Sequence, residues 1–392
     1  MPDDVLSTWK SALSKALRAL EQQHQRRSLT EIRGVDFCSN DYLGLAHHPA
    51  LRDAVVHAVQ TSTRVGGTAS RLLSGQTIAW RKLEEQFAKF AGTEAALFFS
   101  SGYAANMGLL SALVGPDDVV YSDMLNHASL IDGMRLSGAR KVIYPHLDLN
   151  ALENSLRQDA GAPWRRIIVT ESVFSMNGDV APLQDMASLA EKFGAAMIVD
   201  EAHATGVQGK SGSGLVTESG ILPHVLATIH TCGKALASAG AFVCGPQIMK
   251  DYLINHARTF VFSTALPSYF AEQISAALNL ATGMDEERRS LLRRAGELNQ
   301  SLRRAGFDTA DSASQIVPVI LGSNEGTLQA ADHLQKSGFA VRAIRPPTVP
   351  KGSARLRLSL TTRIAESDLH GLVNSLTEWA KAKPERITAR YA

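Results

Sequence analysis

The sequence predicts an α/β fold: a mostly parallel central sheet with helices on both faces, and a smaller α+β C-terminal domain. The first observation is a series of short apolar runs, rich in β-branched and aromatic residues and mostly separated by helical segments. These runs are residues 95–99, 119–122, 141–145, 166–172, 195–201 and 225–231. The second observation is length, because 392 residues exceed what one simple core needs and favour two domains.

The N-terminal part precedes this sheet and reads as a helix and an arm, residues 1–47. A helix is predicted over residues 5–27, because apolar side chains recur there at helical spacing. These side chains are Leu6, Trp9, Leu13, Leu17 and Leu20. A short strand is predicted over residues 35–39. Residues 64–76, which are rich in glycine and serine, interrupt two helical segments and read as a loop.

The large domain is predicted to span residues 48–283. Helical segments such as 103–113, 148–158 and 182–193 connect its strands. Residues 239–245 form a further strand, and this strand follows its predecessor so closely that an antiparallel pairing is expected.

The C-terminal small domain is predicted to span residues 284–392. A long helical region runs from residue 267 to about residue 305, across the boundary. The strands expected after it are residues 315–321, 339–344 and 354–360, and the helices are residues 325–337 and 365–382. This order indicates a small α+β unit.

Composition excludes several classes of protein. The hydrophobic content of 45% and the charged content of 20% are typical of a globular chain, and a net charge of +2 gives no reason to expect a nucleic acid or an anionic membrane as partner. No signal peptide is recognisable, and no apolar run is long enough to span a bilayer. The three cysteines lie far apart without a metal-ligand spacing, so no metal is expected and a reducing cytoplasm fits best.

Polar residues follow the predicted strands, where ligands of parallel sheets bind. Ser101 and Gly102 precede a helix that begins near Tyr103, an arrangement that suits either a bound phosphate or an ordinary helix cap. His127 lies near another helix start and has the same two interpretations, a cap or a functional group. Ser175 follows a third strand, where Asn177 and Gly178 make a polar turn.

The remaining strand ends carry the strongest signals. Asp200 ends a buried strand, where a carboxylate is costly without a cation or hydrogen-bond donors, and His203 follows three residues later. Thr231 and Lys234 follow the next strand. An aspartate for a protonated ring nitrogen, a lysine for a Schiff base, a histidine to stack, and hydroxyls beside a helix N-terminus for a phosphate together predict pyridoxal phosphate binding.

Several motifs resemble those of the α-oxoamine synthases, which are pyridoxal-phosphate enzymes of the aspartate-aminotransferase fold (PLP fold type I). The resemblance covers nearly the whole chain. The matching segments are "SNDYLGLAHHP" (39–49), "SRLLSG" (70–75), "VVYSDMLNHASL" (119–130), "ESVFSMNGD" (171–179), "DEAHATGVQGKSGSG" (200–214), "TCGKA" (231–235) and "AIRPPTVPKGSARLRLSL" (343–360).

The resemblance implies roles for the residues that would surround the cofactor. Lys234 would form the Schiff base, and Asp200 would pair with the pyridine nitrogen. His203 would hydrogen-bond the phenolic oxygen of the ring, and His127 would stack on the ring face. The phosphate and neighbouring cofactor groups would contact the amides of Gly102 and Tyr103 and the side chains of Ser175 and Thr231.

The same resemblance implies how substrates are held. Asn40 and Arg357 would face the amino-acid substrate, with Arg357 gripping its carboxylate through two nitrogens. Arg27 and Thr348 would lie near the acyl chain or the product, although the adjacent Arg26 competes with Arg27 for this role. In the loop at residues 70–75, some relatives carry histidine where this chain has Arg71. The loop is expected to cross to a partner subunit, and no catalytic role is assigned to Arg71.

The activity that the resemblance implies is the decarboxylative condensation of L-alanine with pimeloyl-CoA or a pimeloyl carrier protein, in biotin biosynthesis. It also implies a homodimer whose active sites lie between the subunits. Condensation of glycine with acetyl-CoA is the alternative, since only the pocket around Cα and the acyl tunnel would differ. A catalytically inactive partner subunit is disfavoured because Lys234 is present. A nucleotide-binding protein is disfavoured because "GVQGKSG" (206–212) lacks the spacing of a phosphate-binding loop.

Overall fold

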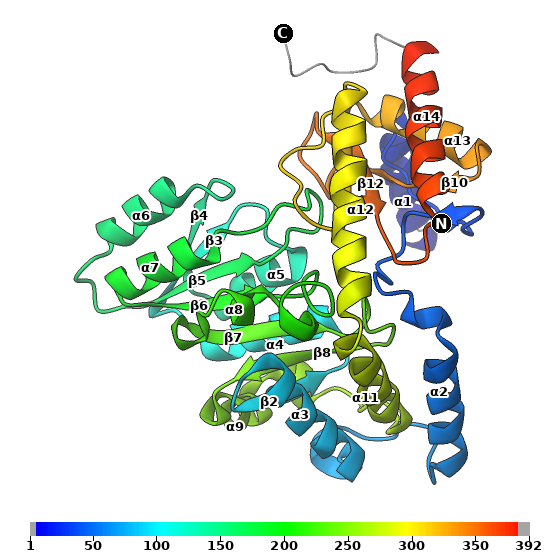
Figure 1. Ribbon diagram of the computed structural model, residues 1–392. Helices are drawn as coiled ribbons and strands as arrows, with labels where there is room; N and C mark the ends of the chain where they lie inside the picture. The colour runs from blue at the N-terminus through cyan, green and yellow to red at the C-terminus, as the bar shows by residue number, and fades with distance from the viewer. Residues whose placement is uncertain (1–4, 383–392) are drawn as a thin grey trace.

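The computed structural model describes residues 5–382 and contains a central seven-stranded sheet (Figure 1). The strand order is β2-β8-β7-β6-β5-β3-β4. The bounds are β2 Ala95–Phe99, β3 Asp118–Asp123, β4 Arg140–Tyr144, β5 Arg165–Glu171, β6 Ala195–Asp200, β7 Val225–Thr231 and β8 Ala241–Gly245. Each strand predicted for the large domain is therefore present, with ends shifted by two residues at most.

The sheet is parallel except at β8. This strand pairs antiparallel with both β2 and β7, as its short connection to β7 predicts. The neighbouring pairs from β7 to β4 are all parallel, so their carboxyl ends meet at one edge of the sheet. That shared edge positions the candidate site.

Helices cover both faces of the sheet, as predicted. On one face, alternate β2 side chains such as Leu97 and Phe99 pack with α4 (Gly102–Leu113), α5 (Ala128–Ser137) and α9 (Gln247–His256). On the other face, Tyr121 and Ile168 pack with α6 (Leu149–Gln158) and α7 (Leu183–Phe193). The α3 helix (Ile78–Ala91) covers the β2 end of this second face, where Phe87 stacks on Phe242 at 3.9 Å between ring centroids. Burial on both faces explains why the strands are continuously apolar.

A smaller three-stranded antiparallel sheet lies in the C-terminal part, in the order β11-β12-β9. Its strands are β9 Ile316–Gly322, β11 Ala343–Ile344 and β12 Ala354–Ser359. The helices around it are α12 Asp285–Arg304, α13 Asn324–Lys336 and α14 Glu366–Ala382 (Figure 1). The predicted α+β character is confirmed, while the domain boundaries stay predictions. Residues 1–4 and 383–392, at the outer ends of the predicted domains, lie outside the described residues.

Two predicted elements are divided in the structure. The strand expected over residues 339–344 is two strands, because β10 (Phe339–Ala340) pairs with β1 (Val35–Asp36) and β11 pairs with β12. The helical region after residue 267 is likewise α11 (Tyr269–Thr282) followed by α12, with Gly283 capping the first.

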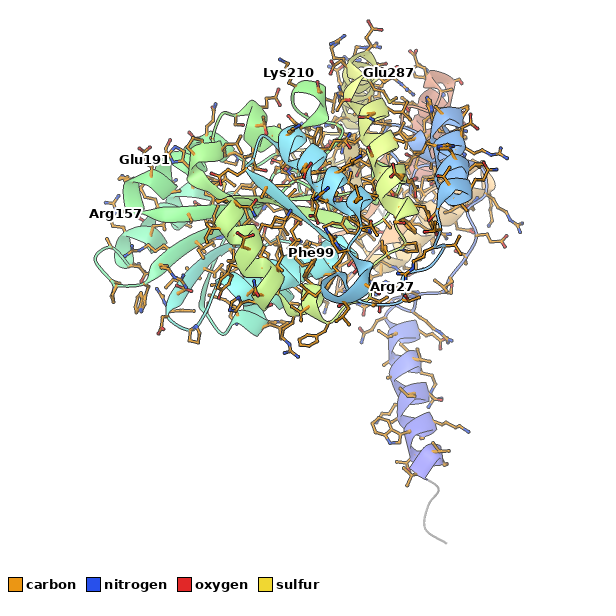
Figure 2. All side chains as sticks on the ribbon, turned by 90° about the horizontal axis from the view of Figure 1, so that it is seen from below. Arg27, Phe99, Arg157, Glu191, Lys210 and Glu287 are labelled. Carbon is orange, nitrogen blue, oxygen red and sulfur yellow. The ribbon has the colours of Figure 1, made fainter. Side chains whose placement is uncertain are left out.

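The N-terminal helix α1 covers residues Val5–Gln22, not the predicted 5–27. It ends where His24 adopts a positive φ of 53°, which a continuing helix does not allow. The helix has no buried residue, and Figure 2 shows it projecting away from the body of the protein. Its apolar stripe is exposed, with Trp9 at 64%. Among residues 5–382, no helix combines the length and apolarity needed to cross a membrane.

The glycine- and serine-rich stretch at residues 64–76 connects α2 (Pro49–Thr61) to α3 and contains a π-helical turn over Arg71–Gly75. Arg71 is buried, and its Nη2 donates to Glu84 Oε1 at 2.9 Å. Glu84 also accepts from Lys250 Nζ at 2.9 Å and from the amide of Phe98 at 3.1 Å. Arg71 therefore has a structural role in this chain, where it neutralises a buried carboxylate.

Candidate active site

The polar residues after the strands meet around one cavity of about 280 Å³ at the carboxyl edge of the sheet. Residues from β5, β6 and β7 and from the starts of α4 and α5 line it. The lining includes nine of the residues selected from the sequence or the resemblance, namely Asn40, Gly102, Tyr103, His127, Asp200, His203, Thr231, Lys234 and the capping Ser101. Strand ends far apart in sequence are thus brought together as the parallel topology requires.

Lys234 lies in the short connection between β7 and β8. Its Nζ is 3.5 Å from Thr231 Oγ1. Burial lowers the pKa of this amine, the carboxylates of Asp200 and Glu171 oppose that effect, and the charge of Arg357 adds to it. The net shift is downward, which increases the neutral, nucleophilic form of the amine.

Asp200 is the buried last residue of β6 and has two hydrogen-bond donors. Asn106 Nδ2 donates to its Oδ2 at 2.7 Å, and the amide of Ala202 donates to its Oδ1 at 2.9 Å. Two donors stabilise the ionised form of a buried carboxyl group. The structure therefore holds this carboxyl group in a fixed position on the cavity wall.

Glu171 is a second carboxyl group in the same wall, and it ends β5 directly beside Asp200 in the strand register. Its Oε1 is buried and has no hydrogen-bond partner among the described residues. Burial raises the pKa of Glu171 well above its ordinary value, and the charge of Asp200 adds to the increase. Of the two neighbouring carboxyl groups, Glu171 is thus the one whose ionised form is disfavoured by burial.

The part of the cavity at the start of α4 is suited to an anion. Ser101 caps α4 by accepting a hydrogen bond from the amide of Ala104 at 3.0 Å. The amides of Gly102 and Tyr103 have no partner among the described residues and point from a helix N-terminus. A Cβ at Gly102 would lie 2.7 Å from Thr231 Cγ2, so only glycine allows this close approach of α4 to β7.

His127 caps the start of α5 with its ring. Its Nδ1 accepts from the amide of Ser129 at 3.3 Å and lies 2.7 Å from Ser129 Oγ. Burial and the charge of Lys234 lower the pKa of His127, while Asp200 opposes them, and burial is the largest effect. The ring lines the cavity in its neutral form, as a flat face against which an aromatic ligand can stack.

His203 lies on the cavity wall near Lys234, and its Nδ1 is 2.6 Å from the hydroxyl of Tyr42. That hydroxyl is also 3.0 Å from Asn40 Oδ1. Burial lowers the pKa of His203 well below its ordinary value, and the charges of Lys234 and Arg357 lower it further. The imidazole is therefore neutral at physiological pH.

Arg357 in β12 joins the small sheet to this wall. Its Nε donates to the carbonyl of Ser175 at 2.5 Å, and its Nη1 donates to Asn40 Oδ1 at 3.1 Å and to Ser359 Oγ at 2.6 Å. Nη2 has no partner among the described residues. Nη2 can accordingly take a carboxylate as the structure stands, whereas a two-nitrogen grip requires Asn40 or Ser359 to release Nη1.

Ser175 lies at the margin of the cavity and does not line it. Its carbonyl binds Arg357, and its amide hydrogen-bonds Glu171. Its backbone is thus fixed between two cavity residues, and its hydroxyl role stays a prediction.

Arg27 and Thr348 are brought together away from the first cavity, and Arg27 lines a second cavity of about 540 Å³. Arg27 Nη2 donates to Thr348 Oγ1 at 3.2 Å. Arg26 also lines this cavity but forms an ion pair with Glu21, so the structure favours Arg27 as the free cation (Figure 2 labels Arg27 at the base of α1). Arg342 and Arg345 add two more guanidinium groups, which make the cavity strongly basic.

Sequence reasoning missed Asn106 and Glu171, which line the cavity, and Tyr42, which contacts the cavity residue His203. Asn106 follows Gly102 by about one helical turn, a spacing that places both on the same side of α4. Tyr42 belongs to the "SNDYLG" motif, and Glu171 is the last residue of its strand. The sequence positions of these residues therefore pointed to the site, but the side chains that they contact are determined by the tertiary structure.

The cavity fits pyridoxal phosphate on the evidence of its own atoms. It holds a lysine amine of lowered pKa, a buried carboxylate with two donors, unpartnered amides at a helix N-terminus, and a flat neutral imidazole. The buried Asn106 Oδ1 and Glu171 Oε1 lack partners, as expected beside a polar ligand. Within residues 5–382, no cluster of metal-ligating side chains occurs.

Comparison with known proteins agrees with this geometry. Residues 32–376 match the family model described as aminotransferase class I and II. The chain is 45% identical over 375 residues to 8-amino-7-oxononanoate synthase of Geobacter sulfurreducens, covering 95% of each chain. Serine palmitoyltransferase from S. paucimobilis, solved with PLP joined to myriocin, superposes with a TM-score of 0.88 at 26% identity, over 97% of this chain and 99% of that one. The 8-amino-7-oxononanoate synthase of Francisella tularensis gives 0.78 at 28% identity, over 90% and 99%.

Proposed function

The chain belongs to the aminotransferase class I and II family, and on this premise we propose that it condenses L-alanine with a pimeloyl thioester to 8-amino-7-oxononanoate, releasing CO2. The observation that carries the proposal is the cavity in which Lys234 and Asp200 face an anion-binding helix N-terminus. The name shared by relatives at 41–46% identity supports this substrate pair over glycine and acetyl-CoA.

The cofactor is pyridoxal phosphate, which supplies an electron-accepting ring that stabilises negative charge at Cα of the amino acid. Lys234 Nζ would hold it covalently, and Asp200 would keep the ring nitrogen protonated. The amides of Gly102 and Tyr103 and the hydroxyl of Thr231 would bind the phosphate.

Lys234 would also move the proton of the reaction. With the amino acid bound, its neutral Nζ would take the proton from Cα of alanine and return a proton after CO2 is lost. The lowered pKa of this amine favours the neutral form that the first transfer needs. Glu171 and Asp200, whose carboxyl groups raise that pKa, would keep the amine basic enough for the transfer.

Arg357 would orient alanine by its carboxylate through Nη2, with Asn40 fixing the guanidinium. His127 would exclude water from one face of the site and hold the ring flat. Arg27, which lines the second, basic cavity and contacts Thr348, would contact the acyl chain or the product.

The proposed assembly is a homodimer, with active sites between the subunits. The exposed apolar stripe of α1 supports a partner subunit, because isolated apolar helices gain stability by packing. The proposed location is the cytoplasm, which three free cysteines support.

The test uses isotope-labelled alanine and purified protein loaded with pyridoxal phosphate. With pimeloyl-CoA, carboxyl-labelled alanine should release labelled CO2, and methyl-labelled alanine should leave its label in 8-amino-7-oxononanoate. Lys234→Ala should lose nearly all turnover, and Lys192→Ala, an exposed lysine on α7, should lose none.

The same assay with glycine and acetyl-CoA decides between the two substrate pairs. We expect a higher kcat/KM for alanine with the pimeloyl donor. A higher value for glycine with acetyl-CoA would replace the proposed activity with the alternative one.

A further inference from the structure

The hydrogen bonds around Tyr42 determine which nitrogen of His203 carries the proton. Tyr42 is fully buried, and its hydroxyl touches two groups that can accept a proton, His203 Nδ1 at 2.6 Å and Asn40 Oδ1 at 3.0 Å. A phenol has one hydrogen to donate. The other donors in the cluster decide where this hydrogen goes.

Asn40 Oδ1 already receives other hydrogen bonds. Arg357 Nη1 donates to it at 3.1 Å, and the hydroxyl of Ser359 donates to it at 3.3 Å. Ser359 accepts from the same Arg357 nitrogen at 2.6 Å, which leaves its own hydrogen for Asn40. Tyr42, at 3.0 Å, is a third donor to an amide oxygen that has two lone pairs, whereas the contact of the same hydroxyl with His203 Nδ1 is shorter, at 2.6 Å.

The short contact indicates which atom accepts. A distance of 2.6 Å between Tyr42 OH and His203 Nδ1 is in the range of bonds donated by a hydroxyl, whereas bonds donated by N–H are mostly 2.9–3.0 Å long. The phenol hydrogen is therefore directed at Nδ1 of His203, and Nδ1 accepts it. Gln315 Nε2 donates to the carbonyl of His203 at 2.7 Å and fixes the backbone that carries this ring.

We propose that Tyr42 is a positioning residue that fixes His203 as its Nε2–H tautomer, so that the cavity receives a hydrogen-bond donor. Nε2 has no protein partner among the described residues, and the ring lines the cavity with Lys234 and Asp200. A donor there suits an oxygen of the ligand, whereas the opposite tautomer would present a lone pair to it. The identity of that ligand as pyridoxal phosphate rests on the proposed function.

The first test reads the tautomer directly. The chain is labelled with ring-15N histidine, and the His203 signals are assigned by their loss in His203→Gln. The 15N shifts should be pyridine-like at Nδ1 and pyrrole-like at Nε2. In Tyr42→Phe they should move toward the average of two exchanging tautomers. Tyr144→Phe, a buried tyrosine that does not line the cavity, should leave them unchanged. Unchanged His203 shifts in Tyr42→Phe would overturn the inference.

The second test is a double-mutant cycle on the dissociation constant of pyridoxal phosphate. Tyr42→Phe alone should weaken binding about tenfold, the effect of one well-placed hydrogen bond. In a His203→Gln background, Tyr42→Phe should raise the dissociation constant less than about twofold, because a glutamine amide donates without help from Tyr42. Equal losses in both backgrounds would show that Tyr42 does not act through His203. Neither test uses an acyl donor, so both remain decisive if the acyl substrate differs from the one proposed.

Discussion

Gly102→Ala tests whether the close approach of α4 to β7 builds the phosphate end of the cavity. The added Cβ would lie 2.7 Å from Thr231 Cγ2, where ordinary contacts begin at 3.4 Å. The methyl group or the helix start must therefore move by at least about 0.7 Å. Overpacking of this kind costs about 1–3 kcal/mol, and we expect it to appear in cofactor binding because both residues line the cavity. The dissociation constant of pyridoxal phosphate should rise about 5- to 150-fold.

The assay is a titration of the cofactor-free protein with pyridoxal phosphate. Thr231→Ser removes the obstructing methyl group and keeps the hydroxyl. In that background, Gly102→Ala should therefore raise the dissociation constant of pyridoxal phosphate only slightly. Gly296→Ala, at an exposed position of α12 where an added Cβ meets nothing within 4 Å, is the control and should bind normally. Binding by Gly102→Ala within twofold of the wild type would refute the reasoning, as would an equal loss in the Thr231→Ser background.

Two further predictions concern stability. Burial lowers the pKa of His146, but hydrogen bonds to two aspartates outweigh it and raise that pKa to about 9. Protonated His146 should therefore add up to about 3 kcal/mol to the free energy of unfolding. This contribution is complete below about pH 6.5 and is lost as the pH rises through about 9. In urea unfolding, the stability of His146→Gln should not fall over this pH range. Arg71→Met should lower the free energy of unfolding by about 2–4 kcal/mol, because Glu84 loses one of two cations, and should leave turnover per folded molecule unchanged.

Exposed ion pairs provide the matched control for Arg71. Arg81→Met removes an arginine on α3 that is 64% exposed and lies 4.0 Å from Glu85. Arg81→Met should lower the free energy of unfolding by less than about 1 kcal/mol. Equal losses of unfolding free energy in Arg71→Met and Arg81→Met would contradict the structural role given to the buried pair. For His146, the contradicting result is an unfolding free energy of His146→Gln that still falls between pH 6.5 and 9.

Strand ends explain why so much of the site could be predicted. A continuous apolar run fixes where a buried strand stops, and parallel strands bring their carboxyl ends to one edge. Asp200, Thr231 and Lys234 are therefore visible from local sequence, and the structure places them together. The fold class follows from the same runs.

Pairing between distant segments explains what was missed. The pairing of Glu171 with Asp200 depends on the register of β5 against β6, which neither strand reveals alone. The division of residues 339–344 likewise depends on two different partner strands, β1 and β12. Tyr42 lies far from His203 in sequence, and only the folded chain brings them together.

The distribution of site residues along the chain has a consequence for synthesis. The residues that would hold the cofactor fall between Gly102 and Lys234, whereas Arg357, which would hold the amino acid, lies in the last tenth of the chain. Because a chain leaves the ribosome from its N-terminus, the cofactor pocket is complete in sequence long before the substrate grip emerges. A chain that terminates early, after β8 but before β12, would therefore contain every cofactor ligand and still be unable to orient an amino acid.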